Sequence, residues 1–132
     1  MITIDTPALV VLFNTRDPDH QRVAHVLETD SGPYVIPALI MAEMAYVVDH
    51  RLGHASVIRL LDNLLSARVM LYCGDKDTER IRNLVERYAD MPLGFADAAV
   101  IACAERHGGR VLTLDHRHFG VVARDAAITI LP

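Results

Sequence analysis

The sequence predicts an α/β fold, a three-layer sandwich with a mostly parallel five-stranded sheet. Short apolar segments with the length of strands alternate with longer helical patterns along the chain, which is typical of a parallel sheet covered by helices. The chain has 132 residues, of which 52% are hydrophobic. This length and composition suit one domain, residues 1–132, with one full core.

The strands of the predicted sheet are five short apolar runs. Most of them end at a glycine, a proline or an aspartate, residues that commonly interrupt regular structure. The runs lie at residues 1–4, 34–37, 69–73, 110–114 and 127–131. Ligands of such sheets bind beyond the carboxyl ends of the strands, and Asp5 and Asp115 stand at two of these ends.

Helices are expected between the strands, at residues 8–13, 21–28, 38–48, 55–66, from Asp77 to Tyr88, and from the Pro92–Ile101 stretch to His107. Thr6 can cap the first helix, and Pro7 suits its first turn. The helix over 38–48 is apolar nearly all round, so most of it is expected to be buried. Gly53 joins that helix to the next one in a hairpin.

Composition limits the environment and the partners. No apolar run approaches the roughly 20 residues of a membrane span, and the N-terminus lacks the basic and apolar segments of a signal peptide. We therefore expect a cytoplasmic protein without a membrane partner. The formal net charge is −4, so attraction to a polyanion must be local. Cys73 and Cys103 lack the spacing of a zinc or redox motif and are expected to be buried thiols.

The stretch Pro92–Ile101 contains one carboxylate, that of Asp97, among apolar residues at the start of a helix. Burying an ionised group without a partner costs several kcal/mol. A metal ion would compensate this charge. Two structural interpretations remain open, because Asp97 could cap the helix or could face water.

Four acidic residues stand where folding alone would favour another residue. Asp5 and Asp115 end strands at the same edge of the predicted sheet, while Glu43 and Asp97 interrupt apolar helices. Carboxylates gathered in one pocket repel one another, and divalent cations keep them ionised. Because the expected ligands are all hard oxygens, Mg²⁺ or Mn²⁺ is the expected ion.

Such a centre favours phosphodiester hydrolysis. One ion, or two ions ~4 Å apart, can lower the pKa of a bound water and stabilise an in-line displacement at phosphorus. Taken singly, Asp5 and Asp115 could instead cap the next helix or start a turn, and Glu43 could pair with an arginine. The occurrence of four such acids on one side of the sheet favours the metal centre.

Four short motifs around these acids follow one another in the chain. They are Ile4-Asp5-Thr6, Ala42-Glu43, Tyr88-Ala89-Asp90 with Gly94-Phe95-Ala96-Asp97-Ala98, and Thr113-Leu114-Asp115-His116-Arg117-His118-Phe119. In this order and spacing they resemble the PIN-domain family, and in particular the VapC toxins of bacterial toxin–antitoxin pairs. The resemblance covers essentially the whole chain.

The resemblance implies a strand order of 3-2-1-4-5 and an Mg²⁺- or Mn²⁺-dependent endoribonuclease that attacks RNA with a metal-activated water. It implies a catalytic and metal-binding quartet of Asp5, Glu43, Asp97 and Asp115. Within that quartet, Asp5 and Asp97 would be the most direct ligands. Thr6 would help to hold a ligand or a water, and Asp90 would support the site or fix a loop.

The resemblance also implies partners. These are an RNA substrate, a second copy of the chain in a homodimer, and a small VapB-like antitoxin whose C-terminal part lies across the active-site groove. Pro7 departs from the family pattern, because a small polar residue is frequent there and proline lacks the backbone N–H. Arg117 is a candidate contact to RNA or antitoxin, with a solvated surface turn as an equal alternative.

The alternative to a nuclease is a non-catalytic PIN-like module that binds RNA or a protein. The sequence lacks the motifs that other α/β enzymes require. No phosphate-binding loop and no nucleophile elbow occurs, and an aspartyl-phosphate phosphatase would carry a second aspartate where this chain has Pro7. His50 and His54 have the four-residue spacing of a zinc site, but Gly53 between them indicates a bend.

Overall fold

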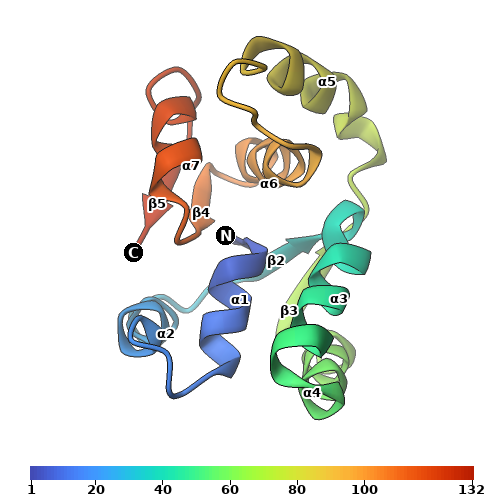
Figure 1. Ribbon diagram of the computed structural model, residues 1–132, viewed down its shortest axis with the longest axis vertical. Helices are drawn as coiled ribbons and strands as arrows, with labels where there is room; N and C mark the ends of the chain where they lie inside the picture. Colours follow the sequence, from blue (N-terminus) through green and yellow to red (C-terminus); the bar gives the residue numbers. More distant parts are fainter.

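Five parallel strands form one sheet in the computed structural model, which describes residues 1–132 (Figure 1). The strands are β1 (Ile2–Ile4), β2 (Tyr34–Pro37), β3 (Val69–Tyr72), β4 (Arg110–Leu112) and β5 (Thr129–Leu131). They lie in the order β3-β2-β1-β4-β5, and every neighbouring pair is parallel. The predicted fold class and strand order are therefore confirmed.

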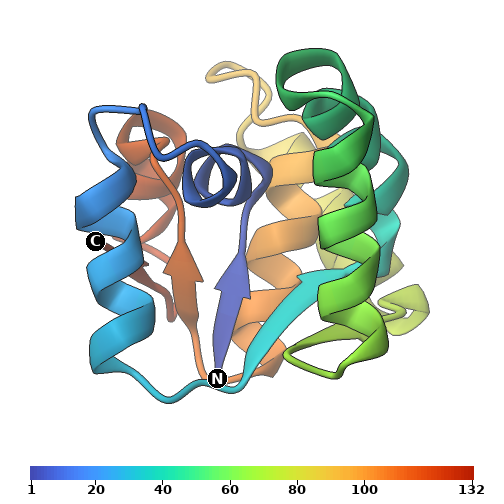
Figure 2. The ribbon, with the colours of Figure 1, turned by 90° about the horizontal axis from the view of Figure 1, so that it is seen from below.

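Helices cover both faces of the sheet. On one side lie α1 (Thr6–Phe13), α2 (His20–Thr29), α3 (Met41–Leu52) and α4 (His54–Leu65), and on the other α5 (Thr78–Arg87) and α6 (Phe95–Arg106). Two 3₁₀ turns, η1 (Ala38–Ile40) and η2 (Asp75–Asp77), precede α3 and α5. Helix α7 (His116–Val122) connects β4 to β5 along the chain. Figure 2 shows the central strands between α2 and α4 in front and α6 behind.

Helix α6 is the central helix of its layer. It packs on β1, β2 and β4, and every residue from Ala98 to Ala104 is buried. At its C-terminal end the chain turns through Gly109, whose φ is +79° and where an added Cβ would lie 2.2 Å from the Ala127 carbonyl oxygen. Only glycine fits there. The turn returns the chain to β4, so α6 runs from the carboxyl edge of the sheet to the amino edge.

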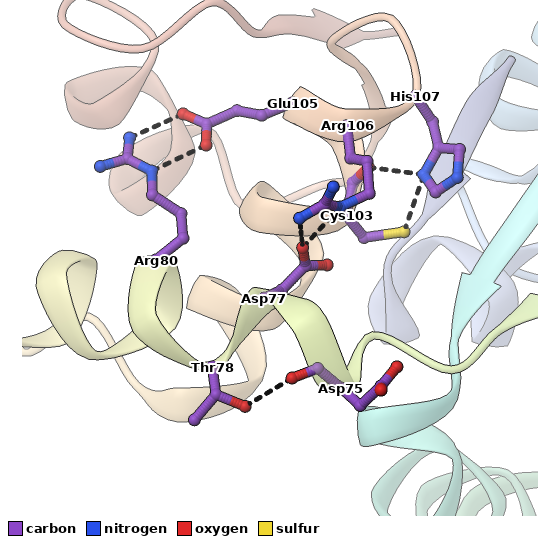
Figure 3. Close-up of polar contacts among 8 residues, drawn as sticks. All are labelled: Asp75, Asp77, Thr78, Arg80, Cys103, Glu105, Arg106 and His107. Atoms are coloured by element: carbon purple, nitrogen blue, oxygen red, sulfur yellow. Dashed lines mark hydrogen bonds and ion pairs between the residues drawn. The ribbon is translucent and has the colours of Figure 1, made fainter.

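Ion pairs fix α6 to the segment before it (Figure 3). Arg80 of α5 donates two hydrogen bonds to Glu105, at 2.8 and 2.7 Å. Arg106 donates to Asp77, at 2.7 Å from both Nε and Nη2, and the Asp77 side chain is only 3% exposed. These contacts hold the C-terminal half of α6 and thereby orient its N-terminal end, which carries Asp97.

Several local predictions are wrong. The helix expected to be largely buried is replaced by η1 and α3, in which Met44 and Val48 are buried but Tyr46 is 70% exposed. Cys103 is buried as expected, whereas Cys73 is exposed. Asp5, and not Thr6, is the N-cap of α1. No helix combines the length and the apolar character that crossing a membrane requires.

Truncation of a buried side chain of α6 should destabilise the protein. Val100 is fully buried, so Val100→Ala removes two methyl groups and leaves a cavity, and we expect a loss of about 2 kcal/mol. Val85 in α5 is 37% exposed, and Val85→Ala should lose less than half of that. Urea denaturation of both variants measures the difference, and equal losses would contradict the central position of α6.

Candidate metal centre

The four predicted acids all stand at the amino ends of helices near the carboxyl edge of the sheet. Asp5 follows β1 and caps α1, while Asp115 caps α7. Asp97 lies in the first turn of α6, and Glu43 in the first turn of α3. The positive end of a helix dipole favours a negative charge at such positions. Local structure and site chemistry therefore use the same residues.

The closest cluster contains two of these acids and one histidine. One oxygen of Asp97, one oxygen of Asp115 and one ring nitrogen of His118 all lie within 4.8 Å of one another. The three side chains remain partly accessible, with 26% of Asp97 and His118 and 31% of Asp115 exposed. Carboxylate oxygens and an imidazole nitrogen at this separation fit a divalent metal ion.

Asp5 lies next to this cluster in a drier position, with 4% of the residue exposed. Its Oδ1 accepts the backbone N–H of Thr6 and its Oδ2 accepts the hydroxyl of Thr113, both at 2.8 Å. The pKa of Asp5 is raised to about 6. Burial is the largest cause, the two hydrogen bonds partly offset it, and the charges of Asp97 and Asp115 add to the rise. Asp5 is thus within electrostatic reach of the cluster without belonging to it.

The remaining acids also influence one another. Burial and the charge of Asp115 raise the pKa of Asp97, and Glu43 adds to this effect. Burial works to raise the pKa of Asp115 too, but hydrogen bonds from the backbone and ring of His118 bring it below its usual value. The acids therefore repel one another in the absence of a cation, and a bound divalent ion would relieve that repulsion.

The other predicted site residues differ in their surroundings. Glu43 is exposed and contributes to the site through its charge on Asp97. The Thr6 hydroxyl is buried without a hydrogen-bond partner, so it is available to bind a water or a ligand. Asp90 and Arg117 are exposed, and their side chains make no hydrogen bond or ion pair within the chain.

Pro7 leaves the Asp5 cap intact. It is exposed and lies in the first turn of α1, where backbone N–H groups have no partner within the helix. The bond to Asp5 comes from the Thr6 N–H instead. The departure from the family pattern therefore removes no hydrogen bond from the acid.

His118 belongs to this cluster, although it lies outside the predicted quartet. From the sequence, His116, Arg117 and His118 could bind a metal or contact phosphate, and no helix is expected there, but the segment forms the short helix α7. Two signals were available, since aspartate is a frequent helix cap and Phe119 and Val122, three residues apart, are both fully buried. A helix starting at His116 brings His118 back beside Asp115.

A mainly apolar groove lies away from the acids. It has a volume of 540 Å³ and lies between α1, α2 and α4, where Phe13, Tyr34 and Leu60 line it. Its walls are mainly apolar and include no member of the acidic quartet. The chemistry of the acids therefore belongs to the carboxyl edge and not to this groove.

Comparisons with known proteins identify the family of the chain. The PIN domain family model matches residues 2–125. Ribonuclease VapC26 of Mycobacterium tuberculosis is 34% identical over 121 residues, which cover 90% of each chain.

Solved structures show the same fold. The crystal structure of VapC20 of Mycobacterium tuberculosis, a toxin that cleaves the sarcin-ricin loop, superposes with a TM-score of 0.79 at 18% identity, covering 92% of this chain and 95% of that one. A toxin–antitoxin complex from Klebsiella pneumoniae gives a TM-score of 0.70 at 21% identity, covering 90% of both chains. From the sequence match and the fold together, the chain belongs to the PIN-domain family and is a relative of its VapC members.

Proposed function

We propose that this chain is a VapC-type toxin, an Mg²⁺- or Mn²⁺-dependent endoribonuclease that acts in the cytoplasm as one nuclease domain, residues 1–132. The observation that carries the proposal is the approach of Asp97 to Asp115 beside the buried Asp5. The identity to a curated ribonuclease supports the same activity. A cluster of mutually repelling carboxylates suits a cation better than it suits a purely structural role.

The residues of the proposed site have different roles, which depend on where they lie. Asp97 and Asp115 hold the ion, and the exposed Glu43 approaches from the solvent side. Thr113 links the two strand-end acids, because its hydroxyl accepts the Asp115 N–H at 3.0 Å and donates to Asp5. When bound, the ion supplies an activated water and neutralises charge on the phosphate oxygens.

The products follow from this chemistry. Water is the nucleophile at phosphorus, so the 2′-hydroxyl of the RNA takes no part in bond breaking. Cleavage then leaves a 5′-phosphate on one fragment and a 3′-hydroxyl on the other. A 2′-hydroxyl mechanism would give cyclic phosphate ends instead, which makes the ends of the fragments diagnostic.

We also propose that a VapB-like antitoxin neutralises the enzyme, with its C-terminal part across the acidic edge of the sheet. Similar structures include a toxin–antitoxin complex from Klebsiella pneumoniae and a DNA-bound VapBC complex from Salmonella typhimurium. The acids at this edge would attract a basic side chain of the antitoxin, and such a side chain would compete with the metal ion.

A homodimer is the third part of the proposal. Most of the large exposed hydrophobic side chains occur on the neighbouring elements η1, α3, α4 and β3, and they are Leu39, Tyr46, Ile58, Leu61, Leu65, Met70 and Leu71. β3 is also an edge strand. Exposed apolar side chains on adjoining elements commonly mark a protein interface, and a second copy of the chain is the partner that we propose for them.

The charge of Asp97 should be essential for RNA hydrolysis. Asp97→Asn keeps the size of the side chain but removes a metal-binding charge, so we expect at least about a hundredfold loss of cleavage at unchanged folding. Cleavage by the wild type should require added Mg²⁺ or Mn²⁺. Sequencing the ends of RNA incubated with each purified variant, in EDTA or with added Mg²⁺ or Mn²⁺, measures the activity, its metal requirement and the 5′-phosphate.

Asp62→Asn is the matched control. Asp62 is exposed near the C-terminal end of α4, which leads to the amino end of β3, at the opposite edge of the sheet. This variant should cleave like the wild type. Cyclic phosphate ends would refute the proposed nucleophile, and absence of metal-dependent cleavage in the wild type would favour the non-catalytic binding module.

Asp5→Asn should stabilise the metal-free protein at neutral pH. The pKa of Asp5 is about 6 in the fold against an ordinary value of 3.8. The folded state therefore retains this proton more strongly, and the contribution of Asp5 to stability falls as the pH rises between these values. At about 1.4 kcal/mol per pKa unit the full loss approaches about 3 kcal/mol above pH 6.

Urea denaturation in EDTA measures this effect. The advantage of Asp5→Asn over the wild type that comes from this charge should be about 1 kcal/mol at about pH 4.5 and about 3 kcal/mol at about pH 7.5, a rise of about 2 kcal/mol. Asp62→Asn again serves as the control, since its carboxylate is exposed. An advantage that does not change with pH would show that the fold does not disfavour the charge of Asp5.

A charge on the exposed apolar surface should separate the dimer. Leu65 at the end of α4 is 85% exposed, so Leu65→Glu adds little strain to one subunit but buries a carboxylate in a subunit interface. We expect a dimer for the wild type and a monomer for this variant in light scattering after gel filtration. Val121→Glu, at a side chain that is 39% exposed on α7, should remain dimeric.

A further inference from the structure

The position of His118 depends on the helix that carries it. Phe119 and Val122 of α7 are fully buried and anchor this helix to the core. Asp115 caps the helix, because its Oδ1 accepts the His118 backbone N–H at 3.0 Å. The ring is therefore held on the side of α7 that faces the acids. With 26% of its side chain exposed, it can still be reached from solvent.

We propose that Nδ1 of His118 is a direct ligand of the ion held by Asp97 and Asp115, so that the centre is a mixed nitrogen–oxygen site that prefers Mn²⁺ to Mg²⁺. This inference rests on the metal site proposed above. It changes the nature of that site, because the acidic quartet alone would offer only oxygen ligands.

The distances in the cluster agree with ligation. Nδ1 lies 2.7 Å from Oδ2 of Asp115 and 4.0 Å from Oδ2 of Asp97. For an octahedral ion with bonds of about 2.1 Å, adjacent ligands are about 3 Å apart and opposite ligands about 4 Å apart. The His118 nitrogen and the Asp115 oxygen can therefore occupy adjacent positions around one ion, and the Asp97 oxygen can occupy the position opposite the nitrogen.

A hydrogen bond between His118 and Asp115 would be replaced by bonds to the ion. Without an ion, Nδ1–H of His118 donates to Oδ2 of Asp115. When an ion binds, the imidazole carries its proton on Nε2 and turns the free electron pair of Nδ1 to the metal. The second oxygen of Asp115 keeps the backbone N–H of His118. The carboxylate thus stays oriented while Oδ2 becomes available to the ion.

The donor set determines the metal preference. Mg²⁺ prefers oxygen ligands and retains several waters, whereas transition-metal ions accept an imidazole nitrogen readily. Loss of His118 should therefore weaken Mn²⁺ binding more than Mg²⁺ binding. If only the carboxylates bind the ion, loss of His118 should instead change the affinities for Mn²⁺ and Mg²⁺ to a similar extent.

Electron spin-echo spectroscopy of Mn²⁺ detects a coordinated nitrogen directly. The probe is Mn²⁺ alone, bound to the full chain of the wild type, His118→Asn and His116→Asn. His116 is the matched control, since it is exposed in the same turn of α7 and lies outside the cluster. We expect nitrogen modulation in the wild type and in His116→Asn, and none in His118→Asn.

Affinities provide the second measurement. Titration calorimetry should show a loss of Mn²⁺ affinity of at least about tenfold in His118→Asn, with a clearly smaller loss for Mg²⁺. If His118→Asn unfolds, wild-type protein labelled with ¹⁵N-histidine shows by a changed modulation frequency that the nitrogen belongs to a histidine, and modulation retained in His116→Asn leaves His118 as the histidine in the cluster. An unchanged frequency overturns the inference.

The outcomes separate this inference from the metal site itself. Mn²⁺ binding without nitrogen modulation in the wild type overturns the role of His118 and leaves the carboxylate site standing. Modulation that persists in His118→Asn also overturns it, because another nitrogen is then the ligand. If the wild type binds neither Mn²⁺ nor Mg²⁺, the proposed metal site fails as well.

Discussion

The mutual repulsion of carboxylates at one edge of the sheet is the constraint on which the site depends. In a parallel sheet the helices that follow the strands begin at the carboxyl edge, so their positive ends meet there. Asp5, Glu43, Asp97 and Asp115 all stand within the first turn or at the cap of such a helix. The fold can therefore collect four negative charges where backbone N–H groups and helix dipoles offset part of their repulsion.

Much of this arrangement could be predicted from the sequence. The alternation of short apolar runs and helical patterns gives the α/β class, and an aspartate directly after a strand must lie at the carboxyl edge of a parallel sheet. The strand order could not be predicted in the same way, because periodicity does not determine which strands are neighbours. Here it followed from the resemblance of four motifs to a family, and the structure has that order.

Two elements escaped prediction for physical reasons. A helix that is apolar all round indicates burial, yet η1 and α3 leave Leu39 and Tyr46 exposed. An exposed apolar surface has the same sequence pattern as one that is buried in the core. Helix α7 has only seven residues, too few for helical periodicity to appear, so its cap and its two buried side chains were the only signals.

The burial of Asp5 argues most strongly that the site is maintained for function. A helix cap needs one side-chain oxygen that accepts an N–H, and serine or threonine would supply it without a charge. Asp5 instead places a second oxygen against Thr113 in a position where burial raises its pKa to about 6. The fold would gain stability by giving up this charge. Groups that a protein keeps ionised against their surroundings cluster at functional sites, and a divalent ion at Asp97 and Asp115 is the partner that would make the charge of Asp5 favourable.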